Sequence, residues 1–287
     1  MTDSSAQPLI RNISDTALWA AVYRARESER PDAIFHDPYA RRLAGERGEQ
    51  IAREMPFGNK NTWSWISRTH LYDQFILDEI RQGADMVVNL AAGLDTRPYR
   101  MALPSSLQWI EVDLPDLLEY KEKALGDEKP VCKLERVRLD LADVSARREL
   151  FARLNARSKR AVIVTEGLII YLSEEEVGSL ARDLASQPSF HRWIIDLASP
   201  GLVKMLSKKM GPQLDKANAP FKFAPMAGAD FFAPHGWKPI EVVGLLKMGA
   251  RLKRLPFFLR LVSLLPEPKG PPGNRPWGGV SLLGKGS

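Results

Sequence analysis

"VVNLAAGLDTRPYR", residues 87–100, is a short apolar run that continues into a turn around Gly93. A strand that ends at a glycine turn and enters a helix is the first unit of many nucleotide-binding α/β sheets. Dinucleotide sites carry three glycines there, so that a pyrophosphate can lie on the helix N-terminus. Here Ala91 and Asp95 stand where two of those glycines would be, and Asp95 would repel a pyrophosphate. The turn therefore favours a ligand without phosphates.

S-adenosylmethionine fits such a turn, because it joins an adenosine to a sulfonium and a zwitterionic amino-acid end. A single glycine is enough to let this ligand approach the backbone of the turn closely, because glycine has no Cβ. The alternative, equally favoured by the local spacing, is that Gly93 only lets the helix and strand pack closely.

Short β-rich runs separated by helical segments follow the turn. Apolar strands alternating with helices predict a mainly parallel sheet with helices on both faces. In such sheets the carboxyl ends of the strands line the ligand crevice. The expected strands are "DMVVNLA" at 85–91, "QWIEVD" at 108–113, "CKLERVRLD" at 132–140, "RAVIVTEG" at 160–167, "RWIIDLA" at 192–198, a short one near 240–243 and a last one, "WGGVSLLGK", at 277–285.

Acidic residues close three of these strands. Asp113 is placed to accept hydrogen bonds from ribose hydroxyls, and Asp140 to accept one from an adenine amino group while Leu141 flanks the ring. Glu166 ends a strongly apolar strand and needs a cationic partner, either a ligand ammonium or an arginine. Each aspartate could instead cap a helix, but three acids at successive strand ends favour a ligand site.

The region before the turn predicts helices, at residues 15–27, 36–48 and 61–83. We interpret residues 1–83 as a helical cover and 84–287 as the α/β core of a single domain. The four histidines show no metal-ligand spacing, so we expect no metal site. Charged residues make up 26% of the chain and both signs are interspersed, which argues against nucleic-acid binding despite the net charge of +6. The N-terminus has no signal-peptide pattern, so the expected location is cytoplasmic.

One apolar and basic stretch lies near the C-terminus, at residues 242–265. It could lie on an anionic membrane surface. Packing on the protein's own sheet, with the Lys and Arg side chains outside, is the favoured interpretation, and no stable membrane insertion is expected.

Taken together, "NLAAGLDTRPYR", "EVDLP", "LDLAD", "TEGLIIYLSEEEV", "FFAPHGWKP" and "PWGGVSLL" resemble the leucine carboxyl methyltransferase family. The resemblance covers nearly the whole chain and is strongest to the bacterial branch of S-adenosylmethionine-dependent O-methyltransferases, often linked to polyketide biosynthesis. It implies a class I methyltransferase fold, Rossmann-like, with a seven-stranded sheet whose last strand is reversed.

The resemblance also implies roles for single residues. The cofactor contacts would come from Ala91, Gly93, Asp113, Asp140, Leu141 and Glu166. Arg68, in "WISRTH", would pair with the cofactor carboxylate. Asp95 and Arg97 would brace the turn. Eukaryotic members carry a cofactor-binding lysine in the first helix, where this chain has Ala20, Arg24 and Arg26, so recognition of a leucine carboxyl terminus is not carried over.

The expected reaction is O-methylation of a carboxylate or hydroxyl on a small molecule, for example a polyketide-like one. A carboxylate needs no general base, whereas a hydroxyl does. Three side chains, His36, His235 and Tyr171, are candidates for that base, and none is assigned as catalytic. Residues Asp37, Tyr39, Trp63 and Trp65 are candidates for the acceptor pocket. The alternatives are a catalytically inert S-adenosylmethionine-binding regulatory protein and, less favoured, a nicotinamide-dependent oxidoreductase.

Overall fold

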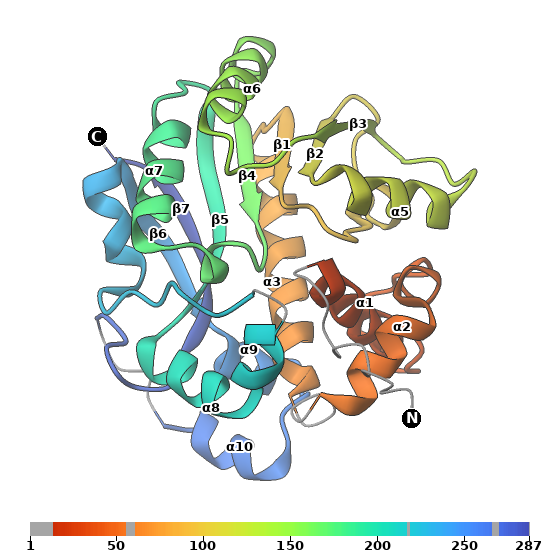
Figure 1. The fold of residues 1–287 in the computed structure, drawn as a ribbon, viewed down its shortest axis with the longest axis vertical. Coiled ribbons are helices and arrows are strands. Elements are labelled where there is room, and N and C mark those ends of the chain that lie inside the picture. The colour runs from red at the N-terminus through yellow and green to blue at the C-terminus, as the bar shows by residue number, and fades with distance from the viewer. Residues whose placement is uncertain (1–13, 56–60, 217–218, 266–269, 287) are drawn as a thin grey trace, which may run out of the picture.

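The computed structural model describes residues 14–55, 61–216, 219–265 and 270–286. Its centre is a seven-stranded sheet in the order β3-β2-β1-β4-β5-β7-β6 (Figure 1). The first five strands are parallel, and β7 runs antiparallel to both of its neighbours. The predicted fold class, including the reversed last strand, is confirmed. The strands are β1 (Met86–Leu90), β2 (Gln108–Asp113), β3 (Lys133–Arg138), β4 (Ala161–Thr165), β5 (Phe190–Ala198), β6 (Trp237–Gly244) and β7 (Gly278–Lys285).

Helices cover both faces of this sheet, as expected for strands such as β1 and β4 whose residues are all buried. On one face, apolar side chains of α6 and α7 pack with those of β1, β4 and β5. On the other face, α3 packs along the sheet with α9 beside it. The helices of the core are α4 (Arg97–Arg100), α5 (Pro115–Leu125), α6 (Val144–Arg157), α7 (Glu174–Ala185), α8 (Pro200–Lys216), α9 (Leu245–Arg251) and α10 (Phe257–Ser263), with 3-10 turns η1 (Ile169–Tyr171) and η2 (Gly228–His235).

Three local features show how the sequence fits its place in the fold. Ser173 and Glu176 form the reciprocal capping box that starts α7. The strand expected near 240–243 is longer, because β6 tolerates Pro239 at the sheet edge and a register shift before Glu241. Cys132 is buried just before β3, and burial raises the pKa of its thiol to about 11.

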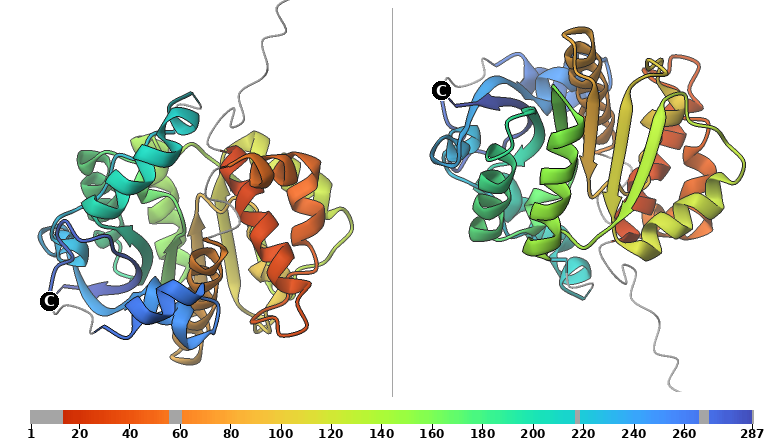
Figure 2. Two further views of the ribbon diagram at one scale, coloured as in Figure 1. Left: turned by 90° about the horizontal axis from the view of Figure 1, so that it is seen from below. Right: turned by 90° about the horizontal axis from the view of Figure 1, so that it is seen from above.

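The three N-terminal helices divide into two groups, which differs from the single cover expected over residues 1–83. Helices α1 (Ser14–Ser28) and α2 (Ala40–Glu54) pack on each other and reach α5; Figure 2 shows them side by side. Helix α3 (Thr62–Arg81) instead belongs to the sheet layer, because its apolar side, with Leu71, Phe75 and Ile76, packs on β1, β2 and β4. The helical cover is therefore formed by α1 and α2, whereas α3 is part of the layer that flanks the sheet.

The stretch 242–265 forms two helices that differ in burial. Its first helix, α9, buries Met248 and Gly249 against the α3 side of the sheet, as predicted. The second, α10, exposes most of its apolar side chains. No helix in the described part of the chain is both long and apolar enough to span a membrane.

Candidate functional site

A large cavity opens at the carboxyl ends of the parallel strands. Its volume is about 1550 Å³, and it extends between the strand ends, α1, α3, α8 and the segment around α10. All seven residues predicted to bind the cofactor line it. They are Arg68, Ala91, Gly93, Asp113, Asp140, Leu141 and Glu166. The sequence-based predictions therefore identified cavity residues in five separate segments of the chain.

The turn after β1 adopts the geometry that its single glycine suggested. Gly93 has a φ of 51°, and Ala91 a φ of 53°, so both lie in the left-handed region. A side chain on Gly93 would add strain there, whereas Ala91 is one of two described non-glycine residues with positive φ. The two residues turn the backbone along the cavity wall, where a ligand can approach it.

Asp113 fixes this turn to the end of β2. Its Oδ2 accepts a hydrogen bond from the Gly93 amide at 2.6 Å, and its Oδ1 accepts one from the Leu114 amide at 2.8 Å. Burial raises the pKa of Asp113, and these two amides oppose that rise. A carboxylate has about four acceptor positions, so each oxygen keeps capacity for a ligand hydroxyl.

The predicted brace between Asp95 and Arg97 is present. Arg97 donates from Nη1 to Asp95 at 2.8 Å and from its backbone amide to the other carboxylate oxygen at 2.8 Å, while Asn89 donates to Asp95 as well. Burial would raise the pKa of Asp95, but the charges of Arg97, Lys121 and Arg100 and the Arg97 amide hold it well below the usual range. Asp95 is therefore ionised and turned toward Arg97.

Arg97 also joins this brace to the end of β4. It donates to Glu166 at 2.9 Å and, through Nε, to Asp73 at 2.6 Å, which Arg100 shares at 2.7 Å. Arg97 is only 2% exposed. Buried charges persist only when they are paired, so the whole group must fold as a unit.

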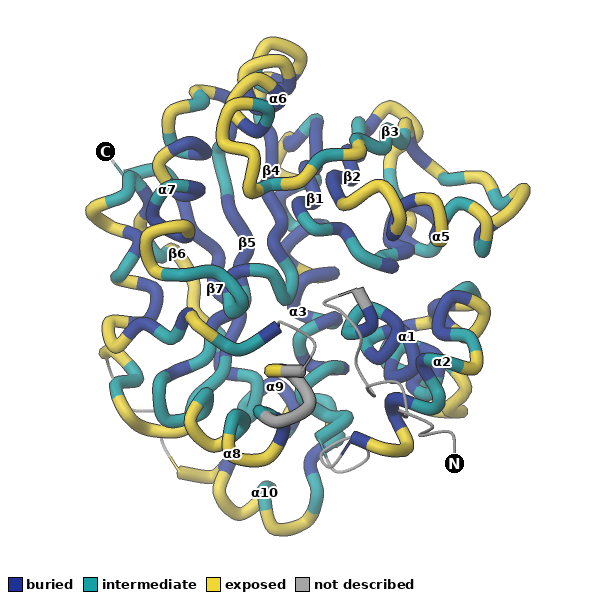
Figure 3. Tube along the Cα trace, viewed as in Figure 1, coloured by how far each residue is buried: buried dark blue, intermediate teal, exposed yellow. Residues whose placement is uncertain are grey.

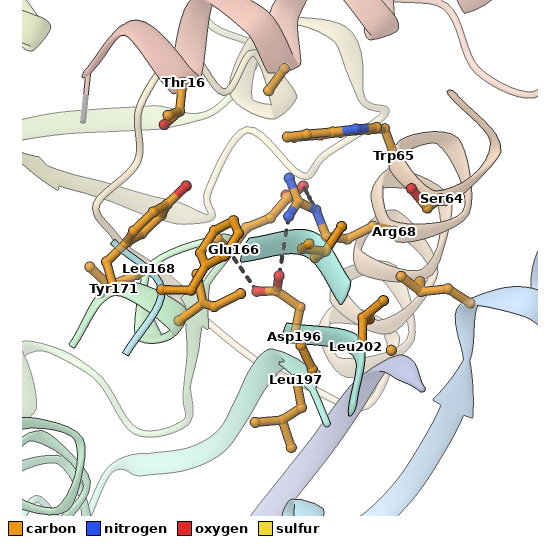
Figure 4. A pocket seen from close by; sticks show the side chains of 18 of the residues that line it. Thr16, Ser64, Trp65, Arg68, Glu166, Leu168, Tyr171, Asp196, Leu197 and Leu202 are labelled. Atoms are coloured by element: carbon orange, nitrogen blue, oxygen red, sulfur yellow. Dashed lines mark hydrogen bonds and ion pairs between the residues drawn. The ribbon is translucent and has the colours of Figure 1, made fainter. Parts of the chain in front are cut away.

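Arg68 contacts the carboxylate oxygen of Glu166 that Arg97 does not contact. Its Nε donates to Glu166 at 3.1 Å and its Nη1 to Asp196 at 3.1 Å, with the Trp65 ring 4.6 Å from the guanidinium. Figure 4 shows Arg68 extending from α3 into the cavity toward these two carboxylates. Its Nη2 makes no hydrogen bond within the described part of the chain. The predicted contact with a cofactor carboxylate stays a prediction, with Nη2 as the atom placed to make it.

The connected network carries an excess of negative charge. Four carboxylates, on Asp73, Asp95, Glu166 and Asp196, meet three guanidiniums, on Arg68, Arg97 and Arg100, which leaves a net charge of −1. A cationic ligand group beside Glu166 would neutralise it. Such a charge suits a ligand that carries a sulfonium and an ammonium.

Asp196 and Tyr72 were missed by sequence reasoning. Asp196, in β5, accepts from Arg68, from the Gly167 amide at 2.7 Å and from the Tyr72 hydroxyl at 3.2 Å. An aspartate inside the apolar run "RWIIDLA" was the available signal, because a buried acid requires partners.

The three candidates for a general base differ in whether they line the cavity. Tyr171 lines the cavity and its hydroxyl points toward Thr16 (Figure 4). Burial raises its pKa, although a hydrogen bond with Thr16 opposes the rise. His36 and His235 do not line the cavity; His235 sits against Arg182. The positions of these two histidines therefore do not support them as candidates for a general base.

The candidates for the acceptor pocket also divide. Trp63 and Trp65 line the cavity, whereas Asp37 and Tyr39 do not. Asp37 instead accepts hydrogen bonds from Arg24 and Thr96, which ties the cover to the turn. Within the described residues, no group of three or more His, Cys, Asp or Glu side chains could hold a metal ion.

Comparison with known proteins agrees with this geometry. The family model of leucine carboxyl methyltransferase matches residues 17–185. A protein of Streptomyces coelicolor is 32% identical over 238 residues, 78% of this chain and 82% of its own, and one of Parafrankia is 30% identical over 249 residues, 80% of this chain and 78% of its own. Both carry the name "Putative S-adenosyl-L-methionine-dependent methyltransferase".

Solved structures support the fold. A "putative methyltransferase" from Thermobifida fusca aligns with a TM-score of 0.57 at 13% identity, covering 99% of this chain and 97% of its own. A DUF574-family protein from Streptomyces avermitilis aligns with a TM-score of 0.56 at 13% identity, covering 93% and 97%. These likenesses extend over the cover as well as the sheet. The family match over residues 17–185 and the two bacterial relatives show that this chain belongs to the leucine carboxyl methyltransferase family.

Proposed function

We propose that this protein transfers the methyl group of S-adenosylmethionine to an oxygen of a small acceptor. The observation that carries the proposal is that one cavity gathers all seven predicted cofactor residues. Membership of a methyltransferase family and the names of the two bacterial relatives support the cofactor.

The order of the strands supports an extended cofactor along the edge of the sheet. Asp140 follows β3, Asp113 ends β2, Gly93 follows β1 and Glu166 follows β4, and these strands are neighbours in that order. Neighbouring strands are about 4.8 Å apart, so the four positions span roughly 14 Å. This order supports a placement with adenine near Asp140, ribose at Asp113 and the amino-acid end near Glu166.

The residues present fit these groups chemically. Asp113 offers ionised acceptors for two ribose hydroxyls, Leu141 an apolar surface for the adenine, and the −1 network a counter-charge for the sulfonium and ammonium. Arg68 Nη2 is placed for the carboxylate. When bound, the cofactor would supply a methyl group on a sulfonium sulfur, which is also the leaving group.

The protein's task is then to orient an acceptor oxygen and to exclude water. The oxygen forms the new O–CH3 bond with its lone pair, and the electrons of the breaking C–S bond stay on the sulfur, which becomes a neutral thioether. A hydroxyl acceptor must also lose a proton, whereas a carboxylate has none to lose. Tyr171 is protonated at neutral pH, because its pKa is raised, and no described histidine lines the cavity. A carboxylate acceptor is therefore the simpler substrate.

Two measurements test the proposal. Calorimetry should show S-adenosylmethionine binding to the purified protein while the nicotinamide dinucleotide does not bind. Incubation with methyl-labelled cofactor and fractionated small molecules should then give a labelled ester or ether, distinguished by the alkaline lability of the ester. Tight binding of the dinucleotide alone would overturn the assignment of the cofactor, and binding of S-adenosylmethionine without any transfer would indicate an inert binder.

A further inference from the structure

Helix α10 and the two leucines that follow it are apolar on two sides. Phe258, Leu259, Val262 and Leu265 line the large cavity. Three other residues, Phe257, Leu261 and Leu264, recur at helical spacing and do not line it. They are 77%, 60% and 79% exposed. The first set borders the cavity, although Phe258, Val262 and Leu265 are themselves 63%, 47% and 64% exposed. The second set lies away from the cavity, and we call it the outer face of α10.

This outer face is unusual for a soluble surface. Single exposed apolar residues are normal, whereas contiguous exposed apolar patches mark sites of interaction. In Figure 3 α10 lies at one end of the molecule, and its tube is mostly in the colour of exposed residues. Ser263 is the only buried residue of the helix. The apolar side chains of the outer face therefore add little to the folded core.

The surrounding segment carries charge of one sign. Between Glu241 and Glu267 the sequence contains five Lys and Arg residues and no acid. Arg254 is engaged by Glu27 and Asp32 of the cover. Lys247 donates to the carbonyl groups of Ser263 and Leu265, which holds the end of α10. The other three cations, which are not fully buried, are Arg251, Lys253 and Arg260.

Exposed apolar side chains combined with cations require a partner that is anionic at its surface and apolar beneath it. An anionic phospholipid bilayer has both properties, and basic residues beside Phe and Leu are the usual composition of interfacial helices. A second copy of this chain would bring an equally basic surface, and the like charges would repel. The charge pattern thus favours the bilayer over self-association.

We propose that the outer face of α10 docks on an anionic phospholipid bilayer. Phe257, Leu261 and Leu264 insert among the acyl chains, and the cations of the segment contact lipid phosphates. Because the first set of apolar side chains lines the cavity, docking places this wall of the cavity next to the bilayer surface. An apolar acceptor dissolved in the bilayer would then lie close to the cavity. The docking itself does not depend on the proposed methyl transfer.

Co-sedimentation of the full chain with vesicles tests this proposal in the absence of any cofactor. The vesicles are phosphatidylcholine alone or phosphatidylcholine mixed with phosphatidylglycerol. We expect binding to the mixed vesicles that weakens when salt is raised from about 0.1 M to about 0.5 M, because salt screens the cationic contribution. Absence of binding to the mixed vesicles at low salt would overturn the proposal.

A matched pair of variants locates the contact. Leu264→Glu should lower the affinity for mixed vesicles at least about tenfold, since it replaces an inserted side chain by a charge. Val131→Glu, at a position that is 42% exposed just before β3, should leave it unchanged. Equal binding by both variants would contradict the assignment to α10. Circular dichroism checks that each variant folds. If Leu264→Glu does not fold, binding of Phe257→Ser to the mixed vesicles is measured instead.

Light scattering on a sizing column tests the rival partner. If the wild-type chain forms a dimer that Leu264→Glu dissociates, the outer face is an interface between copies and the bilayer proposal is wrong. A monomer in both cases supports docking on lipid. Failure of the proposed methyl transfer would leave the vesicle result intact, so the two hypotheses can fail separately.

Discussion

Replacing Asp113 by asparagine tests the assignment of the cofactor site most directly. Both carboxylate oxygens already accept a backbone hydrogen bond, from Gly93 and from Leu114. In the proposed complex each oxygen also accepts one ribose hydroxyl. Hydrogen bonds to charged groups contribute about 1.5–3 kcal/mol each. The asparagine side chain keeps one acceptor oxygen and has a donor in place of the other, so the variant loses the charge and at least one of these bonds.

The expected loss of binding free energy is about 3 kcal/mol, which corresponds to an affinity for S-adenosylmethionine about 100-fold weaker. The same substitution places the asparagine NH2 group opposite a backbone N–H. Because neither donor then has an acceptor there, the free energy of unfolding should fall by about 1–3 kcal/mol. Calorimetric titration measures the affinity, and thermal unfolding without ligand measures the second effect. The two are separable because the first requires ligand.

Asp116→Asn is the matched control, because Asp116 is exposed on α5 and does not line the cavity. It should bind the cofactor as the wild type does. A folded Asp113→Asn protein with the affinity of this control would refute the placement of the ribose at the end of β2.

Three further predictions concern the charge network. Arg97→Met should lower the free energy of unfolding by about 3–5 kcal/mol, measured in urea, because it leaves buried carboxylates without their partner; a loss below about 1 kcal/mol would contradict the shared role of this cation. Glu166→Gln should weaken S-adenosylmethionine about tenfold but S-adenosylhomocysteine much less, since only the former carries a sulfonium; equal losses in calorimetry would argue against a counter-charge. The pKa of Asp95 is lowered in the folded state, so the ionised side chain stabilises the fold fully above about pH 4, and this contribution is lost as the pH falls through the folded-state pKa. In urea titrations between about pH 4 and 2, the free energy of unfolding of Asp95→Asn should therefore fall less steeply with pH than that of the wild type. Equal pH dependence in the two proteins would refute this.

Local patterns in the sequence were sufficient for the sheet and for the part of the cavity wall formed by the strand ends. Strand ends are visible as apolar runs closed by Asp113, Asp140 and Glu166, and parallel topology places those ends at one edge. Gly93 marks a turn that requires positive φ. Such signals are local, or depend only on the topology of the fold, and they do not require knowledge of side-chain packing.

The partners of the buried charges could not be predicted in the same way. Arg68 and Asp196 are 128 positions apart in the chain, and Arg97 and Glu166 are 69 apart. Which arginine meets which acid depends on the packing of α3 against β4 and β5, and interspersed charges across the sequence offer many equivalent pairings. The two-sided character of α10 was hidden for a related reason, because apolar content does not reveal whether a neighbouring element covers a helix face.

The turn and the cover depend on each other, which explains why the charged residues of the "GLDTR" segment need not contact the ligand. Arg24 of α1 donates to the Leu94 carbonyl at 2.6 Å and to Asp37 at 2.9 Å, and Thr96 donates to the same Asp37 oxygen at 2.6 Å. Asp95 is held by Arg97 from the core side. The turn is therefore fixed by the cover on one side and by the charge network on the other. Asp95 and Arg97 line the cavity together with Ala91 and Gly93, but their polar groups are already bonded within the protein in this way.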